Sequence, residues 1–522
     1  MRNIFLFFLL PSLFFVFNAA DCTVSDPSKV DCGFTGVTQS QCESSGCCWV
    51  PGSQGSSTPW CFYPAGHTDV CTNLSFTATG PGFSDSDFSN MQGFFYANLN
   101  IQGKGGVVAS PDTATPGGSY YYAWARDAAL SMKSYMFIND FSLPTIETNM
   151  DAYVQWVLRV QGESDPNNID VRIEPKFNLP NGDPYTGGWC RPQTDGPALR
   201  AATLSLYAQV LIAAGKTDAV KQYLWTGSSS YNGGAVKHDL DWVVANWQQS
   251  GCDLWEEVQC TDFFWGRLNF RNGLLKGAAL ADKMGDSATA ATYRSTAATI
   301  EAAIAGHWTG TFIKEADNRQ MDASVVSAFN EGFADDDFFK PTDTQVAQTV
   351  STLNTLFCHQ FAINQADTTN GIPGVLYGRY QGDSYAGGNP WVLLSADLAK
   401  LFYRAALSIA QAKKAGVQLL ADSDYAVWVN TLNLPADSLN TEFLGNNKDI
   451  NLSNSMLAAG DAVMQRIYYH VKGDGGHLAE QIDKSTGVQM SAKDLSWSYA
   501  CTLVALKTRA QAVALLQNYS IS

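Results

Sequence analysis

The chain has 522 residues, of which 45% are hydrophobic and 12% are aromatic. This composition predicts folded domains with a large core and excludes an intrinsically disordered protein. The formal net charge of −16 argues against a nucleic-acid partner, because the phosphates would be repelled. Neutral ligands are compatible with this charge.

The first 20 residues have the pattern of a secretory signal peptide. Arg2 precedes a short apolar run, and Asn18, Ala19 and Ala20 follow it, as cleavage requires. The alternative interpretation of this segment is a membrane anchor. No later stretch reaches the roughly 20 apolar residues that a spanning helix needs. We therefore expect a protein that is secreted to the extracellular space or resides in a vacuolar or lysosomal lumen. We also expect it to be a monomer. We expect no membrane association after signal cleavage.

Three Asn-X-Ser sequons and twelve cysteines fit an oxidising secretory route. The sequons predict glycosylation at Asn73, Asn451 and Asn518. Because thiols oxidise in such a compartment, we expect most of the cysteines to be paired in disulfide bonds.

Residues 21–66 contain half of the cysteines, and this segment is too short to build a sufficient core without disulfides. Six cysteines allow many pairings, which spacing alone does not resolve. The segment resembles a trefoil (P-type) domain in its adjacent Cys47 and Cys48, in the following Trp49 and in the later pair Cys61-Phe62. We expect this domain to pack on a catalytic domain, with a sugar-binding cleft as the alternative. The resemblance implies the pairs Cys22–Cys48, Cys32–Cys47 and Cys42–Cys61.

Residues 67–82 are predicted to be a linker, and residues 83–522 carry mostly helical patterns. Apolar residues recur every three to four positions in segments such as 195–215, 261–285 and 491–517. About a dozen such segments are joined by loops rich in Gly, Trp, Asn and Tyr, and convincing strands are few. We therefore predict a ring of helix pairs whose loops form a site at one end, with a plain helical bundle as the alternative.

Five loops between these segments each combine an acid or an arginine with tryptophan or tyrosine. Aromatic rings bury the apolar faces of sugars, while charged groups bind the hydroxyls. Cleaving a glycosidic bond requires two carboxyl groups, one protonated and one ionised. Each loop alone also has a structural interpretation, for example an ion pair at Arg126 and Asp127 or tryptophans that belong to the core. Their recurrence favours a carbohydrate-active site. The loops are Tyr120–Ala129, Tyr185–Arg200, Asp253–Val258, Tyr377–Trp391 and Gly475–Tyr499.

The sequence contains no motif for several other chemistries. There is no G-x-S-x-G elbow, H-E-x-x-H pair or glycine-rich phosphate loop, and the six histidines lack zinc-ligand spacing. We therefore expect neither a metal nor a cofactor. Cys252 and Cys260, which bracket Glu256 and Glu257, are predicted to form disulfides with each other or with other cysteines. Pairing stays open within the second set of six: Cys71, Cys190, Cys252, Cys260, Cys358 and Cys501.

From about Phe83 onward the sequence is similar to the glucoamylases of glycoside hydrolase family 15. The resemblance implies an all-α protein whose catalytic domain, residues 83–522, is an (α/α)6 barrel. It also implies an exo-acting glucan 1,4-α-glucosidase that releases β-D-glucose from starch, glycogen or malto-oligosaccharides with inversion. The matching segments, in the family's order, are "YYYAWARDAAL", "EPKFNLPNGDPYTGGWCRPQTDGPALRA", "DLWEEV", "GRYQGDSYAGGNPW" and "AEQIDKSTGVQMSAKDLSWSYA".

The same resemblance assigns roles to residues within these segments. It implies that Glu256 is the general acid, that Glu480 is the general base activating water, and that Glu257 binds substrate. Cys190 departs from the family, in which glycine commonly follows the tryptophan at this place. The other implied substrate-binding residues are Tyr120, Trp124, Arg126, Asp127, Trp189, Arg379 and Trp391.

Three alternative functions are compatible with parts of the pattern. One is a related α-glucosidase that acts on trehalose or α-1,6 glucans. Another is a non-catalytic glucan-binding or regulatory protein on the same barrel, although a binder has no need for both Glu256 and Glu480. The third is an interaction protein whose trefoil domain carries the function.

Overall fold

The computed structural model describes residues 21–517, apart from 27–28, 30–31, 33–36, 45, 53–57, 67–68, 226–233 and 436–447. The predicted signal peptide, residues 1–20, and the sequon at Asn518 lie outside the described residues. The chain divides into two compact units, Met1–Asp69 and Val70–Ser522. Within the described parts, no helix is long and apolar enough to cross a membrane.

The small unit is held together by disulfide bonds. It contains a short helix, α1 (Gln39–Ser44), and two antiparallel strands, β1 (Cys48–Trp49) and β2 (Cys61–Phe62). Its small core is built around Cys42, Cys47 and Cys61, so covalent bonds replace the apolar burial that such a short segment lacks. The bonds are Cys22–Cys48, Cys32–Cys47 and Cys42–Cys61, the three pairs that the trefoil resemblance implies.

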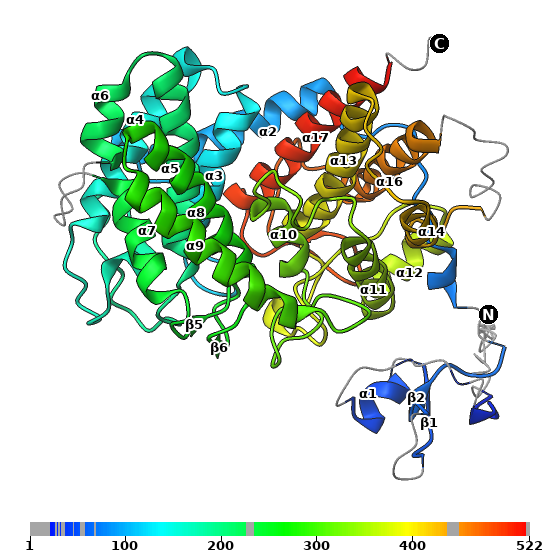
Figure 1. Cartoon of the computed structure of the whole chain (residues 1–522). Helices are drawn as coiled ribbons and strands as arrows, with labels where there is room; N and C mark the ends of the chain where they lie inside the picture. The colour runs from blue at the N-terminus through cyan, green and yellow to red at the C-terminus, as the bar shows by residue number, and fades with distance from the viewer. Residues whose placement is uncertain are drawn as a thin grey trace, which may run out of the picture. The chain divides into compact units, whose positions relative to one another are not determined.

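Six helices of the large unit form a closed ring, in which each helix contacts the next and the last contacts the first (Figure 1). Most of their residues are buried, including all eight of α10, because helices in the middle of a domain are covered on every side. This ring confirms the predicted all-α barrel and excludes the plain bundle. The helices are α3 (Ala125–Ile138), α5 (Asp195–Ala213), α8 (Phe264–Met284), α10 (Ser324–Glu331), α13 (Val392–Ala415) and α17 (Ser496–Leu516).

Further helices pack around this ring and are amphipathic. In α4 the buried residues Ile146, Met150, Tyr153 and Val157 recur every three to four positions and so form one apolar face. Helix α2 packs on α17, α4 on α3 and α5, α7 on α5 and α8, α9 on α8, and α16 on α13 and α17. Their bounds, with those of the remaining helices, are α2 (Asp85–Ala97), α4 (Leu143–Gln161), α6 (Thr217–Ala219), α7 (Ala235–Asn246), α9 (Ser287–Ile304), α11 (Thr344–Gln360), α12 (Ala362–Thr369), α14 (Asp422–Thr431) and α16 (Lys448–Val471).

Three short two-stranded antiparallel sheets lie next to the N-terminal ends of ring helices. Strand β3 (Tyr122–Trp124) runs directly into α3 and pairs with β4 (Lys176–Asn178). Strands β5 (Gly251–Cys252) and β6 (Gln259–Cys260) precede α8, and β7 (Gln481–Ile482) and β8 (Gln489–Met490) precede α17. The loops that combine acids with aromatics in the sequence are thereby held at one end of the ring.

The large unit contains two disulfide bonds, Cys71–Cys358 and Cys190–Cys252. Cys260 and Cys501 are free thiols. The prediction that Cys260 forms a disulfide is therefore wrong, because Cys252 is joined to the loop before α5 instead. Of the predicted glycosylation sites in the large unit, Asn73 and Asn451 are exposed, and their modification stays a prediction.

Candidate active site

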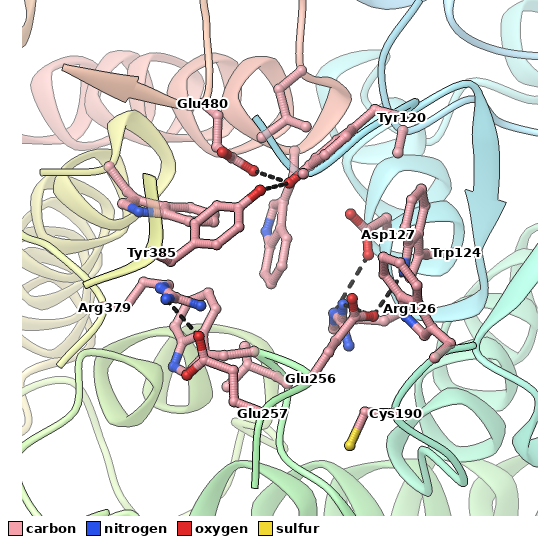
Figure 2. Close-up of a pocket in the computed structure, with 18 residues that line it drawn as sticks. Tyr120, Trp124, Arg126, Asp127, Cys190, Glu256, Glu257, Arg379, Tyr385 and Glu480 are labelled. Carbon is pink, nitrogen blue, oxygen red and sulfur yellow. Dashed lines mark hydrogen bonds and ion pairs between the residues drawn. The ribbon is translucent and has the colours of Figure 1, made fainter. Parts of the chain in front are cut away.

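A pocket of about 270 Å³ lies where the N-terminal ends of the ring helices meet. Its walls come from the segments that precede α3, α5, α8, α13 and α17 or begin these helices. All ten residues predicted to bind substrate or act in catalysis line it: Tyr120, Trp124, Arg126, Asp127, Trp189, Glu256, Glu257, Arg379, Trp391 and Glu480. Figure 2 shows Glu480 and Glu256 on opposite sides of this pocket.

Glu256 lies at the tip of the hairpin between β5 and β6 and has a left-handed backbone conformation, with φ of 68°. Such a conformation costs about 1–3 kcal/mol for a residue with a side chain. The turn is held by Asp253, whose Oδ1 accepts hydrogen bonds from the backbone N–H groups of Glu257 (2.7 Å) and Val258 (3.0 Å). The hairpin thus fixes the direction in which Glu256 points.

One carboxylate oxygen of Glu256 is fully engaged by its neighbours. Its Oε1 accepts hydrogen bonds from Trp124 Nε1 (2.7 Å) and Gln193 Nε2 (2.8 Å). A guanidinium nitrogen of Arg126 lies 3.6 Å from the same oxygen. Among the described residues, none donates a hydrogen bond to Oε2. The second oxygen is therefore the one that can carry and transfer a proton.

Glu257 points away from Glu256 into a cluster of cations. Its Oε1 accepts a hydrogen bond from Arg379 (2.8 Å), and its Oε2 lies 3.1 Å from Arg319 and accepts a hydrogen bond from Tyr380. Burial acts to raise the pKa of Glu257, but Arg379, Tyr380 and Arg319 together hold it below its usual value. Glu257 is thus an ionised carboxylate that anchors Arg379 at the pocket wall.

Glu480 is almost completely buried, with 2% of its surface exposed. It accepts hydrogen bonds from the hydroxyl of Tyr120 (2.9 Å), from Gln481 (2.9 Å) and from Ser491 (2.6 Å). Burial raises the pKa of Glu480, and these three hydrogen bonds oppose the rise. A buried carboxylate held in one orientation by three donors is suited to accept a proton from water.

Replacing Tyr120 with Phe is expected to move the acidic limb of the kcat/KM profile to higher pH. The Tyr120 hydroxyl stabilises the ionised form of Glu480, so its loss raises the pKa of this base, and activity is then lost at a higher pH on acidification. A hydrogen bond to a charged group contributes about 1.5–3 kcal/mol, so we expect kcat to fall by about tenfold or more. The pH profile of initial rates measures both effects.

Tyr385→Phe is the control, because the Tyr385 hydroxyl contacts that of Tyr120 at 2.9 Å and makes no hydrogen bond to Glu480. Its acidic limb should move less than that of Tyr120→Phe. Equal profiles for the two variants would contradict a direct role of Tyr120 on Glu480.

Several buried polar atoms at the pocket have no hydrogen-bond partner among the described residues. They are Trp189 Nε1, Trp391 Nε1, and Arg126 Nε with Asp127 Oδ2, which form an ion pair with each other at 3.4 Å. Buried polar atoms are rarely left unpaired in folded proteins, and these belong to residues that line the pocket. Burial raises the pKa of Asp127 to about 6, although Arg126 opposes the rise. These groups are suited to pair with the hydroxyls of a bound sugar.

The structure adds residues to which the sequence assigned no role. Lys176 on β4 is buried, and its ammonium lies 3.6 Å from the ring centre of Trp189 and 4.6 Å from that of Trp124. Two further rings, those of Tyr122 and Tyr185, also face it. Burial lowers the pKa of Lys176 to about 8. Lys176 thus holds the two tryptophans of the wall together through cation–π contacts.

The disulfide Cys190–Cys252 joins the loop that carries Trp189 to the hairpin that carries Glu256. Two hydrogen bonds also connect this loop to the hairpin. The backbone N–H of Cys252 donates to the carbonyl of Pro192 (2.8 Å), and Gln259 Nε2 donates to the carbonyl of Arg191 (3.0 Å). Cys190 itself lines the pocket (Figure 2). The bond therefore positions an aromatic wall against the residue predicted to be the acid.

We expect the double variant Cys190→Ser/Cys252→Ser to lose about 2–4 kcal/mol of unfolding free energy, as typical disulfides contribute. The freed loop should also raise KM for malto-oligosaccharides more than it lowers kcat, because Trp189 is no longer fixed. Denaturant unfolding and steady-state kinetics measure the two effects. Cys260→Ser is the control on the same hairpin, since that thiol is free. If both variants behave alike, the disulfide has no positioning role.

Comparisons with known proteins identify families and relatives that this chain resembles. The Glycosyl hydrolases family 15 model matches residues 94–507, and the Trefoil (P-type) domain model matches residues 22–64. A glucoamylase of Blastobotrys adeninivorans is 31% identical over 451 residues, which cover 82% of this chain and 71% of that protein. Glucoamylase 1 of Rhizopus oryzae is 32% identical over 449 residues, covering 80% and 69%. The solved glucoamylase structure from Saccharomycopsis fibuligera aligns with a TM-score of 0.72 at 26% identity, covering 84% of this chain and 100% of that one.

Proposed function

The chain belongs to family 15 of the glycosyl hydrolases and carries a trefoil (P-type) domain at its N-terminus, and we propose that it is an exo-acting glucan 1,4-α-glucosidase. Its substrates are α-glucans such as starch and glycogen, and malto-oligosaccharides. The observation that carries this proposal is the pocket in which two carboxyl groups, Glu256 and Glu480, lie on opposite sides (Figure 2). An inverting hydrolysis needs this arrangement, because water attacks from the side opposite the leaving group.

In the proposed reaction Glu256 is the general acid. With Oε1 engaged by Trp124 and Gln193, the proton is carried on Oε2 and passes to the glycosidic oxygen as the bond breaks. Glu480 accepts a proton from the attacking water, and the hydroxyl of Tyr120 beside it orients that water. The released glucose then has the β configuration at its new anomeric hydroxyl.

The remaining pocket residues bind the non-reducing end of the chain. Arg126 and Asp127 form an ion pair whose facing atoms make no hydrogen bond, and they supply polar groups for the hydroxyls of the terminal glucose. Trp124, Trp189 and Trp391 cover its apolar faces. Arg379 is fixed by two hydrogen bonds to Asp383 and one to Glu257, so its charge is presented in one orientation. A pocket lined in this way favours removal of single glucose units from chain ends.

We also propose the domain limits 21–66 for the trefoil, 67–82 for the linker and 83–522 for the catalytic domain. The segments matched by the two family models support the trefoil and catalytic ranges. The large compact unit begins at Val70, within the proposed linker. The pattern of residues 1–20 supports secretion to the extracellular space or delivery to a vacuolar or lysosomal lumen.

The proposal is tested by incubating the purified protein with maltopentaose and following the anomeric proton of the first released glucose by NMR. Immediate appearance of β-glucose is the expected result. If α-glucose appears first, inversion and both carboxyl roles are wrong. If no glucose is released while maltopentaose still binds, the protein is a glucan-binding relative rather than a hydrolase of these substrates.

A further inference from the structure

A second cavity in the large unit, of about 560 Å³, shares no lining residue with the catalytic pocket. We call it the basal cavity, because most of the ring-helix residues that line it come from the C-terminal halves of those helices. The catalytic pocket is built at the N-terminal ends of the same helices, so the two lie toward opposite ends of the ring. The ring helices contribute, among others, Lys133 from α3, Leu206 from α5, Lys276 from α8, Glu331 from α10, Arg404 from α13 and Thr508 from α17.

The basal cavity is present because helix α10 is short. It has 8 residues, whereas the neighbouring ring helices α8 and α13 have 21 and 24. At 1.5 Å per residue, α10 spans only about 12 Å, while α13 spans about 36 Å. Beyond Glu331, α10 therefore no longer fills the space between α8 and α13, and the loop that follows supplies Phe333 and Lys340 to the cavity wall.

Cations outnumber carboxylates in the wall of the basal cavity, in a chain whose net charge is −16. Of the three carboxylates, Asp336 already forms an ion pair with Arg271 at 2.6 Å, and Arg271 does not line the cavity. Glu331 is shared between Lys133 (2.7 Å) and Lys400. The five cations are Lys133, Lys276, Lys340, Lys400 and Arg404, and the carboxylates are Glu331, Asp335 and Asp336.

Arg404 forms no ion pair with a carboxylate of the described chain. One of its nitrogens donates to the backbone carbonyls of Phe329 (2.8 Å) and Asn330 (3.2 Å) at the end of α10. Burial lowers the pKa of Arg404. It also lowers the pKa of Lys133, and the nearby Lys400 and Lys276 lower that pKa further. Burial thus disfavours these two charges, although Glu331 opposes the fall in the pKa of Lys133 and carboxylates oppose that of Arg404. The pKa of Lys400 is raised, because Glu331 and Asp397 outweigh its burial.

Capping of the C-terminal end of α10 explains only part of the positive charge in the wall of the basal cavity. Lys133 and Arg404 contact carbonyls at the end of α10, as cations near a helix C-terminus commonly do. Lys276 and Lys340 have other partners, Asp335 (3.5 Å) and Asp337 (3.4 Å), whose side chains are 79% and 100% exposed. Such exposed pairs are weak, so these two ammonium groups remain available to a ligand.

Part of the remaining wall is apolar. The rings of Phe137, Phe141 and Phe333 line it together with Leu407 and Leu419. The guanidinium of Arg404 lies 4.9 Å from the ring centre of Phe333, so the charged and aromatic parts of the wall adjoin. A ligand that fits both parts has a negative head and an apolar body.

We propose that the basal cavity binds a small organic anion with an apolar body, such as a medium-chain carboxylate. Its head would pair with Lys276, and its body would lie against the phenylalanine rings. The volume falls within the range of about 300–1,000 Å³ that is typical of small-molecule sites. This site is separate from the proposed hydrolysis, and its test does not depend on that activity.

Isothermal titration of the full chain with octanoate at neutral pH tests the proposal, with octanol and octylammonium as probes of the same length. Octanoate should bind saturably at one site, octanol about tenfold or more weakly, and octylammonium not at all, since only the carboxylate pairs with the cations. No saturable binding of octanoate, or equal binding of octanol, would overturn the proposal.

Variants of α8 identify the site. Lys276→Gln should weaken octanoate binding by about tenfold, and Lys276→Glu should abolish it. Lys283→Gln is the matched control, because Lys283 is exposed on the same helix and does not line the cavity. Thermal unfolding of each variant verifies that the fold is kept. Binding of octanoate to Lys276→Glu with wild-type affinity would place the ligand elsewhere and overturn the assignment.

Discussion

Replacing Glu480 with Gln is expected to lower kcat on maltopentaose by about 10²- to 10⁴-fold, the usual contribution of a general base. The amide keeps the size of the side chain and the carbonyl that can accept from Tyr120, but it cannot take a proton from water. Substrate contacts on the other side of the pocket are unchanged, so binding should be retained. Initial rates and equilibrium binding of maltopentaose measure the two quantities separately.

The control for this variant is Ser491→Ala, which removes one hydrogen bond to Glu480 and leaves the carboxylate in place. Its kcat should fall far less than that of Glu480→Gln. If Glu480→Gln keeps more than about a tenth of the wild-type kcat, the loss is too small for a general base. Water activation would then have to be assigned to another group.

The ring of helices could be predicted from local patterns of apolar residues, and the members of its pocket from the family resemblance of short motifs. Each motif, for example Tyr120–Ala129 or Asp253–Val258, stands directly before a ring helix. Since every ring helix begins at the same end of the barrel, residues that precede these helices must meet there. The ten predicted residues therefore lie in one pocket although they are up to 360 positions apart, as Tyr120 and Glu480 are.

Contacts between segments could not be predicted in the same way. Lys176 stands in a quoted motif, but its cage of four rings is created only when β4 pairs with β3. The sequence leaves the partner of Cys252 open between Cys260 and other cysteines. Its partner is Cys190, because folding brings the loop before α5 next to the hairpin of Cys252. The basal cavity depends on the length of α10 relative to α13, which a pattern of apolar residues in one segment does not show.

Replacing Glu256 with Gln should separate bond cleavage from water activation. On maltopentaose we expect kcat to fall by about 10²- to 10⁴-fold, because the glycosidic oxygen is a poor leaving group without a proton. On α-D-glucosyl fluoride the loss should be much smaller, since fluoride leaves without protonation. The carbonyl of the introduced amide can still accept from Trp124 and Gln193, so the pocket geometry is kept. Glu480→Gln, in contrast, should lose both activities, because each needs an activated water.

The neighbouring variant Glu257→Gln is the matched control for this prediction. It weakens the contacts with Arg379 and Arg319, so KM should rise for both substrates while their ratio of kcat values stays near that of the wild type. If Glu256→Gln lowers kcat on both substrates equally, the proton-donor role is wrong. The carboxylate would then act through its charge beside Arg126, at 3.6 Å, and the strained turn of the hairpin would serve to place that charge.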